Sequence, residues 1–334
     1  MDYSRRDLGK LALGAVPGVL MANAMPIGTV AAAQAAKPNS NFGGVQIGII
    51  APYSFQGMAT TVQDVLKRTV ELGLSAVELR AAEIETFAGL PPAPATPAAP
   101  AAAPGAAAAE PTAAELASQK QRGAVVRKWR LSQSFAKYRE LRQMYESAGV
   151  SIRIARLALN DGWTDEEIDY AFQAAKALGA QAINCEPPVS QTKRLGLFAD
   201  KHQMLLGYHN HANVTSVEAF GRPGSWEQAF FYSPRNGANL DIGHFVAGNS
   251  ASPIPFIQEY HQRITGLHLK DRRINGGPNV PWGEGDTPIR DVLQLMKREK
   301  YTFMATIELE YRVDGSDAMA ELKKCVEFCR QALA

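Results

Sequence analysis

Seven residues with metal-binding or acid–base side chains lie at or just after apolar runs in the second half of the chain. They are His209, His211, Asp241, His244, His268, Glu308 and Glu310. The chain has only six histidines, so their concentration in this region is informative. Imidazole and carboxylate groups together bind divalent cations, and imidazole also transfers protons near neutral pH. These residue types indicate metal binding, acid–base chemistry or both.

Four of these residues end successive β-rich runs and form the predicted metal-binding set. They are His209, Asp241, His268 and Glu308. Burying Asp241 and Glu308 together without a cation would be costly, which favours one divalent ion over a purely structural polar network. The ligands suit Mn²⁺ first, with Mg²⁺, Co²⁺ or Zn²⁺ as alternatives. His211 remains an alternative to His209, and Glu310 an alternative to Glu308.

The remaining polar residues are candidates for catalysis or substrate binding. His211 and His244 could move a proton or hold substrate hydroxyls, or they could hydrogen-bond a ligand carboxylate. Glu310 could act as an acid. Lys270 could neutralise a developing enolate, or it could pair with Asp271 in a surface salt bridge.

Two further candidates come from loops. Glu186, in "NCEPP", could reach the cavity, although a glutamate before two prolines is usually solvated. Trp282, in "WGEG", could stack on a sugar ring or merely cover the core, and the glycines of this stretch predict a tight turn.

Eight short β-rich runs, alternating with helical patterns, must position these side chains. The runs cover 45–50, 76–80, 150–157, 180–185, 204–209, 237–242, 264–269 and 302–309. Amphipathic segments such as 61–74, 165–179 and 288–300 separate them. The count and alternation predict an α/β fold, a single eight-stranded (β/α)8 TIM barrel, whose chemistry lies at the carboxyl ends of the strands. The alternative, an open doubly wound sheet, usually carries a Gly-rich phosphate turn, and neither GxGxxG nor GxxxxGK[ST] occurs.

Side-chain alternation predicts which residues of the last strands face inward. His268 and Lys270 share one face of their strand, as Thr306, Glu308 and Glu310 share one face of the next. The apolar residues between them take the opposite face, toward the outer helices: Leu267, Leu269, Ile307 and Leu309. The polar set should therefore point into the barrel.

Two segments depart from the alternation. Residues 89–115 are rich in proline and alanine and lack the large apolar residues that would offset their ordering entropy, which predicts a flexible insertion after the second strand. Residues 1–35 contain "SRRDLGK" before a moderately apolar run, a pattern typical of a twin-arginine export signal, with cleavage after Ala24 or Ala35. A short membrane anchor is the alternative, but Pro17 and several glycines interrupt the run. We therefore expect export by the twin-arginine machinery to the periplasm, and a barrel domain over 36–334.

Composition excludes several partners. The formal charge of the chain is +2 and its hydrophobic content is 46%, so neither a nucleic-acid footprint nor a polybasic membrane patch is indicated. No later segment is long and apolar enough for stable membrane insertion. Cys185, Cys325 and Cys329 are too few for a disulfide framework or zinc knuckle, and the last two fit buried positions on a final helix.

Four motifs, in this order, carry a family resemblance: "NLDIGHFVAGN" (239–249), "LHLKDRR" (267–273), "PWGEGDTPI" (281–289) and "TIELEY" (306–311). From about residue 45 onward the chain resembles the xylose isomerase-like TIM barrels, which include sugar isomerases and epimerases, inosose dehydratase and endonuclease IV. The resemblance implies a metal held by the last four strands, at His209, Asp241, His268 and Glu308. The early histidines of endonuclease IV and of true xylose isomerases have no counterpart here, because no histidine precedes His202.

The resemblance also implies a reaction. A divalent ion would polarise the carbonyl of a sugar or keto-sugar, and a base would remove the adjacent proton. Epimerases of this group usually carry Glu where His209 stands, whereas "YHNH" resembles the "YHHH" stretch of inosose dehydratase. Three functions follow: a sugar isomerase or epimerase, a lyase of the inosose dehydratase or 3-keto-glycoside type, and a noncatalytic exported sugar-binding barrel. Export and the lack of a phosphate-binding turn favour a non-phosphorylated substrate.

Overall fold

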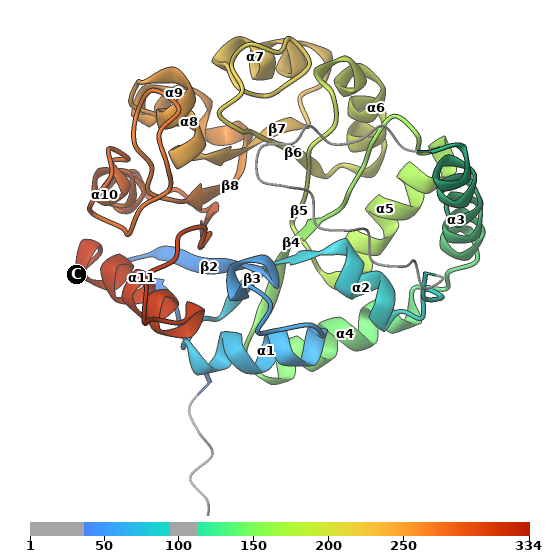
Figure 1. The fold of residues 1–334 in the computed structure, drawn as a ribbon, viewed down its shortest axis with the longest axis horizontal. Coiled ribbons are helices and arrows are strands. Elements are labelled where there is room, and N and C mark those ends of the chain that lie inside the picture. The colour runs from blue at the N-terminus through green and yellow to red at the C-terminus, as the bar shows by residue number, and fades with distance from the viewer. Residues whose placement is uncertain (1–36, 94–111) are drawn as a thin grey trace, which may run out of the picture. The chain divides into compact units, whose positions relative to one another are not determined.

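The computed structural model describes residues 37–93 and 112–334, and Lys37–Ala334 form one compact unit. Eight parallel strands follow one another around a closed sheet, in which the first, β2, pairs with both β3 and the last, β9 (Figure 1). The barrel strands are β2 (Val45–Ala51), β3 (Ala76–Arg80), β4 (Ser151–Arg156), β5 (Ala182–Cys185), β6 (Leu205–His209), β7 (Asn236–Asp241), β8 (Ile264–Leu269) and β9 (Met304–Ile307). The predicted TIM barrel is confirmed.

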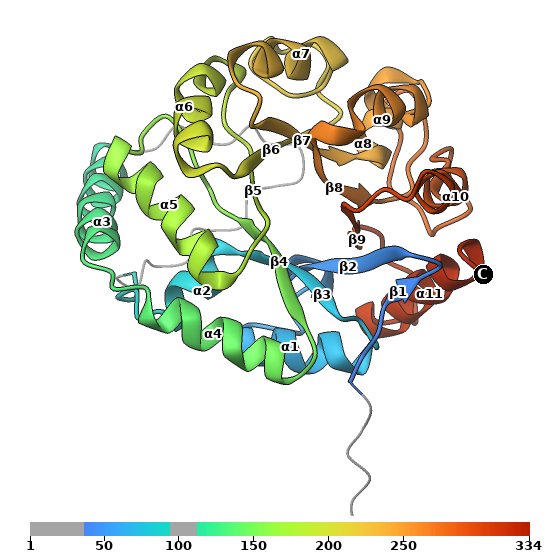
Figure 2. The same ribbon diagram turned by 180° about the vertical axis from the view of Figure 1, so that it is seen from behind.

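Helices surround the strands in both views (Figures 1 and 2). In chain order they are α1 (Val62–Glu71), α2 (Ala81–Phe87), α3 (Ala113–Leu131), α4 (Ala136–Ser147), α5 (Asp165–Leu178), α6 (Thr192–His202), α7 (Pro223–Tyr232), α8 (Ile242–Asn249), α9 (Ile254–Tyr260), α10 (Ile289–Glu299) and α11 (Ala318–Ala332). Three 3-10 turns, η1 (Tyr53–Phe55), η2 (Val189–Gln191) and η3 (His261–Arg263), complete the described elements. No helix of the described residues is long and apolar enough to cross a membrane.

Strand alternation divides the core into two parts. The outward-facing residues Leu267, Leu269 and Ile307 are fully buried in the main core between the strands and the helices. Inside the barrel, Ala76, Ile154 and Met304 form a small separate apolar cluster. Ile154 of β4 reaches β8 on the far side of the barrel, where a Cβ on Gly266 would lie 2.9 Å from its Cδ1 atom. The predicted facing of the last strands is confirmed.

The segment between β3 and β4 corrects one predicted boundary. Thr112 caps α3 by accepting a hydrogen bond from the Glu115 amide, and the Glu115 side chain accepts one from the Thr112 amide. The predicted insertion, 89–115, therefore ends too late, because 113–115 are helical. Residues 94–111 lie outside the described residues, as does the predicted export signal, 1–35.

The other local differences are small. The sequence did not predict β1 (Asn41–Phe42), which pairs antiparallel with β2. Cys325 and Cys329 are buried, unpaired thiols on α11, as predicted, and Cys185 is buried at the end of β5.

Candidate active site

The four predicted ligands meet at the carboxyl ends of the last four strands. His209 ends β6, Asp241 ends β7, His268 lies in β8 and Glu308 directly follows β9. Register aligns Asp241 with His268, and all four side chains are buried. One ligand atom from each lies within 4.8 Å of those from the others. We call these four residues the inner site.

Hydrogen bonding fixes the orientation of His209. Its Nδ1 atom lies 2.9 Å from Asn239 Oδ1, and the Asn239 amide nitrogen donates to the carbonyl of Gly266. Asn239 Oδ1 is therefore the acceptor, so Nδ1 of His209 carries the hydrogen and Nε2 carries the lone pair. Burial, followed by the charge of Arg156, holds the pKa of His209 well below its usual value. A neutral imidazole with one fixed lone pair is what a metal ligand requires.

His268 lies between two carboxylates. Its Nδ1 atom is 2.7 Å from Glu308 Oε2, and its Nε2 atom is 3.0 Å from Glu78 Oε2. Burial lowers the pKa of His268, but Glu78 and Glu308 outweigh burial and raise it to about 10. In the absence of another cation the ring is charged. When Nε2–H donates to Glu78, Nδ1 can lose its proton and present a lone pair beside Glu308.

The two carboxylate oxygens of Asp241 have different surroundings. Its Oδ1 atom caps α8 by accepting the His244 amide at 2.7 Å, while Asn210 hydrogen-bonds both backbone groups of Asp241. Its Oδ2 atom is buried and makes no hydrogen bond, although Lys270 Nζ lies 3.0 Å away. Burial raises the pKa of Asp241. Oδ2 is thus a carboxylate oxygen available to a ligand.

The predicted surface salt bridge between Lys270 and Asp271 is wrong. Lys270 is 1% exposed, and its Nζ atom lies 2.6 Å from Glu310 and 3.3 Å from Glu308, in addition to the contact with Asp241. Burial lowers the pKa of Lys270, but these carboxylates together raise it above its usual value. A buried ammonium therefore lies beside the inner site, as the catalytic alternative for Lys270 requires.

Negative charge exceeds positive charge around the inner site, which is the test of whether these residues fit a metal. The carboxylates are Glu78, Glu186, Asp241, Glu308 and Glu310, and the cations that pair with them are Arg156 and Lys270. The five carboxylates outnumber these two cations, and they still outnumber three cations when His268 is charged. A divalent cation would offset most of the excess. Together with the free Asp241 oxygen, this imbalance shows that the residues fit a metal ion.

Glu186 and His211 form a second polar group next to the inner site. His211 Nε2 lies 3.3 Å from Glu186 Oε1, and Glu186 also pairs with Arg156. Burial raises the pKa of Glu186, but His211 and Arg156 overcome this effect and lower the pKa to about 2. The His211 side chain is 56% exposed. Glu186 thus points toward the inner site from its rim, and both Glu186 and His211 remain accessible to solvent.

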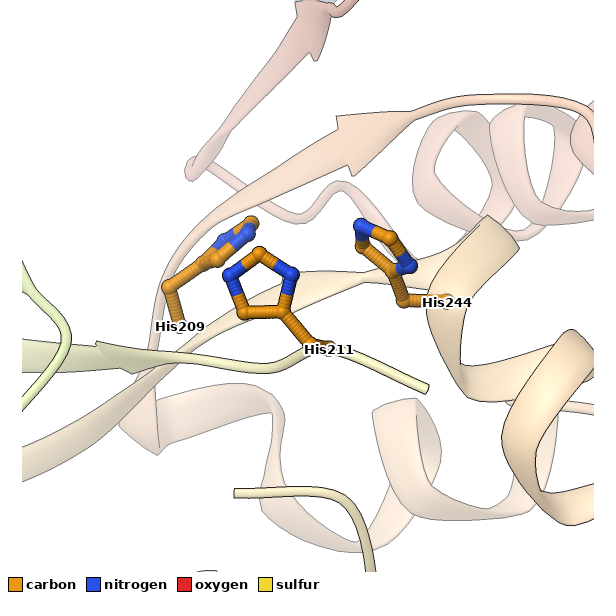
Figure 3. Close-up of side chains that lie close together, drawn as sticks. All are labelled: His209, His211 and His244. Atoms are coloured by element: carbon orange, nitrogen blue, oxygen red, sulfur yellow. The ribbon is translucent and has the colours of Figure 1, made fainter. Parts of the chain in front are cut away.

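His244 is held by two cations. Its Nε2 atom lies 3.0 Å from Lys270 Nζ, and its Nδ1 atom lies 2.6 Å from Arg272 Nη1. Burial and then Lys270 lower the pKa of His244 to about 3. Its backbone amide, rather than its ring, donates to Asp241, because ring Nε2 is 4.0 Å from Asp241 Oδ2. Figure 3 shows the ring near those of His209 and His211.

Glu310 lies beside the inner site without belonging to it. In addition to Lys270, it accepts hydrogen bonds from Tyr53 of η1 and from the side-chain amide of Asn279. Burial and the negative charge of Glu310 raise the pKa of Tyr53 above its usual value. A cavity of about 400 Å³ is lined by Tyr53, Gln56, Asn279, Leu309, Glu310 and Arg312. Its volume falls within the range of about 300–1,000 Å³ typical of ligand sites.

Trp282 lies at the start of the predicted tight turn. Its ring packs edge-on against Phe328 of α11, with centroids 5.7 Å apart, so its contacts support the alternative that it covers the core. The turn itself is confirmed, because Asp271 accepts the amides of Gly283 and Gly285 at 2.7 and 3.0 Å. A Cβ at Gly285 would collide with the Asp271 carboxylate, so glycine is required there.

Several polar residues of the barrel interior were not predicted. Glu78 on β3, Arg156 on β4, and the asparagines 184 and 239 on β5 and β7 are buried or half-buried around the predicted set. Glu78 Oε2 accepts from Asn184 at 3.0 Å, which orients it toward His268. Glu78 has the parity of the inward-facing Ala76 and Arg156 that of the inward-facing Ile154, and this shared parity is the signal that could have identified them.

Comparison with known proteins identifies the family. Residues 104–332 match the model of the xylose isomerase-like TIM barrel family, so the chain belongs to that family. A comparison with curated proteins found no match.

Three solved structures illustrate the shared fold. A sugar phosphate isomerase/epimerase from Parabacteroides distasonis is 17% identical, with a TM-score of 0.56 over 87% of this chain and 96% of that one. The probable 3-DHS dehydratase of petrobactin synthesis from Bacillus anthracis is 12% identical, with a TM-score of 0.56 over 85% and 98%. The IolI protein, solved with a zinc atom, is 12% identical, with a TM-score of 0.56 over 87% and 99%.

Proposed function

We propose that this protein is a metal-dependent isomerase or epimerase of a non-phosphorylated sugar or keto-sugar. The inner site would hold one divalent ion, Mn²⁺ in the first instance, through His209 Nε2, Asp241 Oδ2, His268 Nδ1 and Glu308. When bound, such an ion polarises a substrate carbonyl and makes the neighbouring C–H more acidic. The protein's own side chains must then move the proton.

One observation carries the proposal: two proton-carrying groups approach the inner site from opposite sides of the barrel. Glu186 and His211 follow β5 and β6, whereas Tyr53 and Glu310 follow β2 and β9. In the cyclic order of eight strands these pairs are four strands apart. A substrate between them would have a proton acceptor on one face and a proton donor on the other, as epimerisation requires.

Lys270 and His244 have supporting roles in this proposal. The Lys270 ammonium lies between Glu308 and Glu310, where it can stabilise negative charge on a substrate oxygen. His244 can accept a hydrogen bond from a substrate hydroxyl when the Lys270 contact is released. Arg156 and Lys270 are already paired with carboxylates, which favours a substrate without a phosphate group.

A lyase of the inosose dehydratase or 3-keto-glycoside type is the second candidate. It is favoured by His209, an imidazole where epimerases of this group usually carry a carboxylate, and by the structural similarity to a probable dehydratase. The same two proton-carrying groups could remove a proton and protonate a leaving group.

Incubation with keto-sugars and glycosides in D2O tests both candidates. An isomerase or epimerase incorporates deuterium at the carbon next to the carbonyl and keeps its mass otherwise, whereas a lyase releases water or an aglycone. We expect the Asp241→Asn variant to lose about 100-fold or more of the rate, because a metal contributes several kcal/mol to such a step. His261→Ala, at a half-buried histidine of η3 outside the inner site, is the matched control. Saturable sugar binding without deuterium exchange would contradict both candidates and indicate a noncatalytic sugar-binding protein.

We also propose that the protein is exported by the twin-arginine pathway, on the basis of the "SRRDLGK" motif. Replacing Arg5 and Arg6 by lysine should retain a tagged chain in the cytoplasm, whereas the unchanged chain should be recovered outside it with a shortened N-terminus. Recovery of both chains in the same compartment would contradict the proposal.

A further inference from the structure

Three imidazole rings converge beside the inner site (Figure 3). The ring centroids of His209 and His211 are 5.2 Å apart, those of His211 and His244 are 4.8 Å apart, and those of His209 and His244 are 6.2 Å apart. One nitrogen from each ring lies within 4.8 Å of the other two. His209 and His211 come from the end of β6 and the residue two positions later, and His244 comes from the first turn of α8.

We propose that His209, His211 and His244 form a second metal position, the outer site, which binds a Zn²⁺-like cation and competes with the inner site for His209. The inner site offers two imidazoles and two carboxylates, which suits Mn²⁺ or Mg²⁺ as well as softer ions. The outer site offers three imidazoles, which suit Zn²⁺, Cu²⁺ and Ni²⁺.

The two sites compete for His209 because its hydrogen bond with Asn239 leaves it one lone pair. Because Nδ1 carries a hydrogen that Asn239 accepts, His209 has one lone pair, at Nε2. His209 belongs to both groups of potential ligands, and each would have to use this one lone pair. One lone pair binds one ion, so an ion in the outer site removes a ligand from the inner site.

Glu186 supplies a fourth ligand and negative charge to the outer site. Its Oε1 atom lies 3.8 Å from His209 Nε2 and 3.3 Å from His211 Nε2. Ligand distances of 2.0–2.1 Å in a tetrahedral zinc site place neighbouring ligand atoms about 3.3 Å apart. The separations around Glu186 are therefore already close to those of a bound ion.

Ligation by His244 requires only a local change. A neutral imidazole has one lone pair, yet Lys270 and Arg272 each contact one of its two nitrogens. In either tautomer one of these contacts is not a hydrogen bond. If His244 turns to an ion, Lys270 remains paired with Asp241, Glu308 and Glu310.

Exposure determines which site an ion meets first. The inner-site residues are at most 5% exposed, whereas the side chain of His211 is 56% exposed. An ion arriving from solvent therefore reaches the outer site before the inner one. Zinc held there would keep Mn²⁺ from its full set of ligands.

Metal binding to the metal-free protein tests the proposal without an activity assay. Equilibrium dialysis followed by mass spectrometry should find that Asp241→Asn loses Mn²⁺ but retains Zn²⁺. His211→Ala should retain Mn²⁺, and adding His211→Ala to Asp241→Asn, in which the inner site no longer offers its full ligand set, should cost at least about tenfold in Zn²⁺ affinity. The electron paramagnetic resonance spectrum of bound Cu²⁺ should show three nitrogen ligands in Asp241→Asn and fewer in the double variant. His261→Ala should bind both ions as the unchanged protein does.

Two outcomes would overturn the outer site. If Asp241→Asn loses both ions to the same extent, the inner site alone binds metal. If the double variant Asp241→Asn/His211→Ala keeps the Zn²⁺ affinity and the nitrogen count of Asp241→Asn, His211 is not a ligand. A protein that shows the expected binding pattern but has no sugar-converting activity would contradict the proposed function and leave the outer site intact.

Discussion

Two clusters of buried charge in this barrel are built differently. Beneath α3, Arg130 pairs with Glu85 through two nitrogens, at 2.8 and 3.2 Å, and with Glu167 at 3.1 Å. Arg127 binds the other oxygen of Glu167 at 2.9 Å, and Arg130 lies 3.8 Å above the ring of Trp163. Two arginines thus match two acids, and each carboxylate oxygen has a partner.

The centre of the barrel lacks this balance. Its acids outnumber its paired cations, Asp241 keeps an oxygen without a hydrogen bond, and His268 lies between two carboxylates. The cluster under α3 is complete with protein groups alone and fits a structural role. The barrel centre keeps an excess of carboxylates that an added cation would offset, which is how a binding site differs from a structural network.

Breaking the balanced cluster should have the largest effect on stability. Arg130→Met leaves Glu85 buried without a cation and Glu167 with one fewer, which should reduce the free energy of unfolding by about 3–5 kcal/mol. Urea unfolding should show the same loss with and without Mn²⁺. Arg127→Ala is the control, because its side chain is 44% exposed and its loss should cost at most about 1 kcal/mol. Equal effects of the two variants would mean that burial does not distinguish these arginines.

The unbalanced cluster should respond to metal instead. Mn²⁺ at 100 times its dissociation constant should stabilise the protein by about 2.7 kcal/mol. Asp241→Asn should abolish this gain, since asparagine can still cap α8 but does not supply the carboxylate. Calorimetry of both proteins with and without Mn²⁺ measures the difference. If Mn²⁺ stabilises Asp241→Asn as much as the unchanged protein, the ion binds elsewhere.

Lowering the pH should give the smallest change in the free energy of unfolding. It tests the balanced cluster through Glu167. Burial raises the pKa of Glu167, but Arg127 and Arg130 lower it below its usual value of 4.5. The unfolded state therefore binds this proton first, so Glu167 stabilises the fold above pH 4.5 and ceases to do so as pH falls through its lower folded pKa. The difference in unfolding free energy between the unchanged protein and Glu167→Gln should shrink below pH 4.5. A difference independent of pH would show that charge is not what Glu167 contributes.

The barrel and its polar centre were predictable from the sequence for definite reasons. Most β-rich runs were short, bounded and followed by an amphipathic segment, as 45–50 and 150–157 illustrate, so element type was clear. The inward face of β8 followed from the alternation of Leu267, His268 and Leu269. Both signals are local, and the closed barrel requires only their repetition.

The remaining features depend on contacts between distant segments. Lys270 resembled a surface residue because Asp271 is its neighbour, but the carboxylates that hold it come from the ends of two other strands, β7 and β9. Trp282 packs on α11, which begins 36 residues later in the sequence. The start of α3 was obscured because the alanines of a low-complexity stretch are also good helix residues.

The Asp271 carboxylate anchors the turn over 283–287, at the rim of the barrel, because it accepts the backbone amides of Gly283, Gly285 and Thr287. The anchor of this turn therefore depends on one acid and on Gly285, while the side chain of Arg272 holds the preceding stretch through the carbonyl of Gly277. Glu284, which is exposed in this turn, can change without loss of the loop's anchor. The rim can thus diversify during evolution, or be re-engineered, while the strands that carry the chemistry stay unchanged.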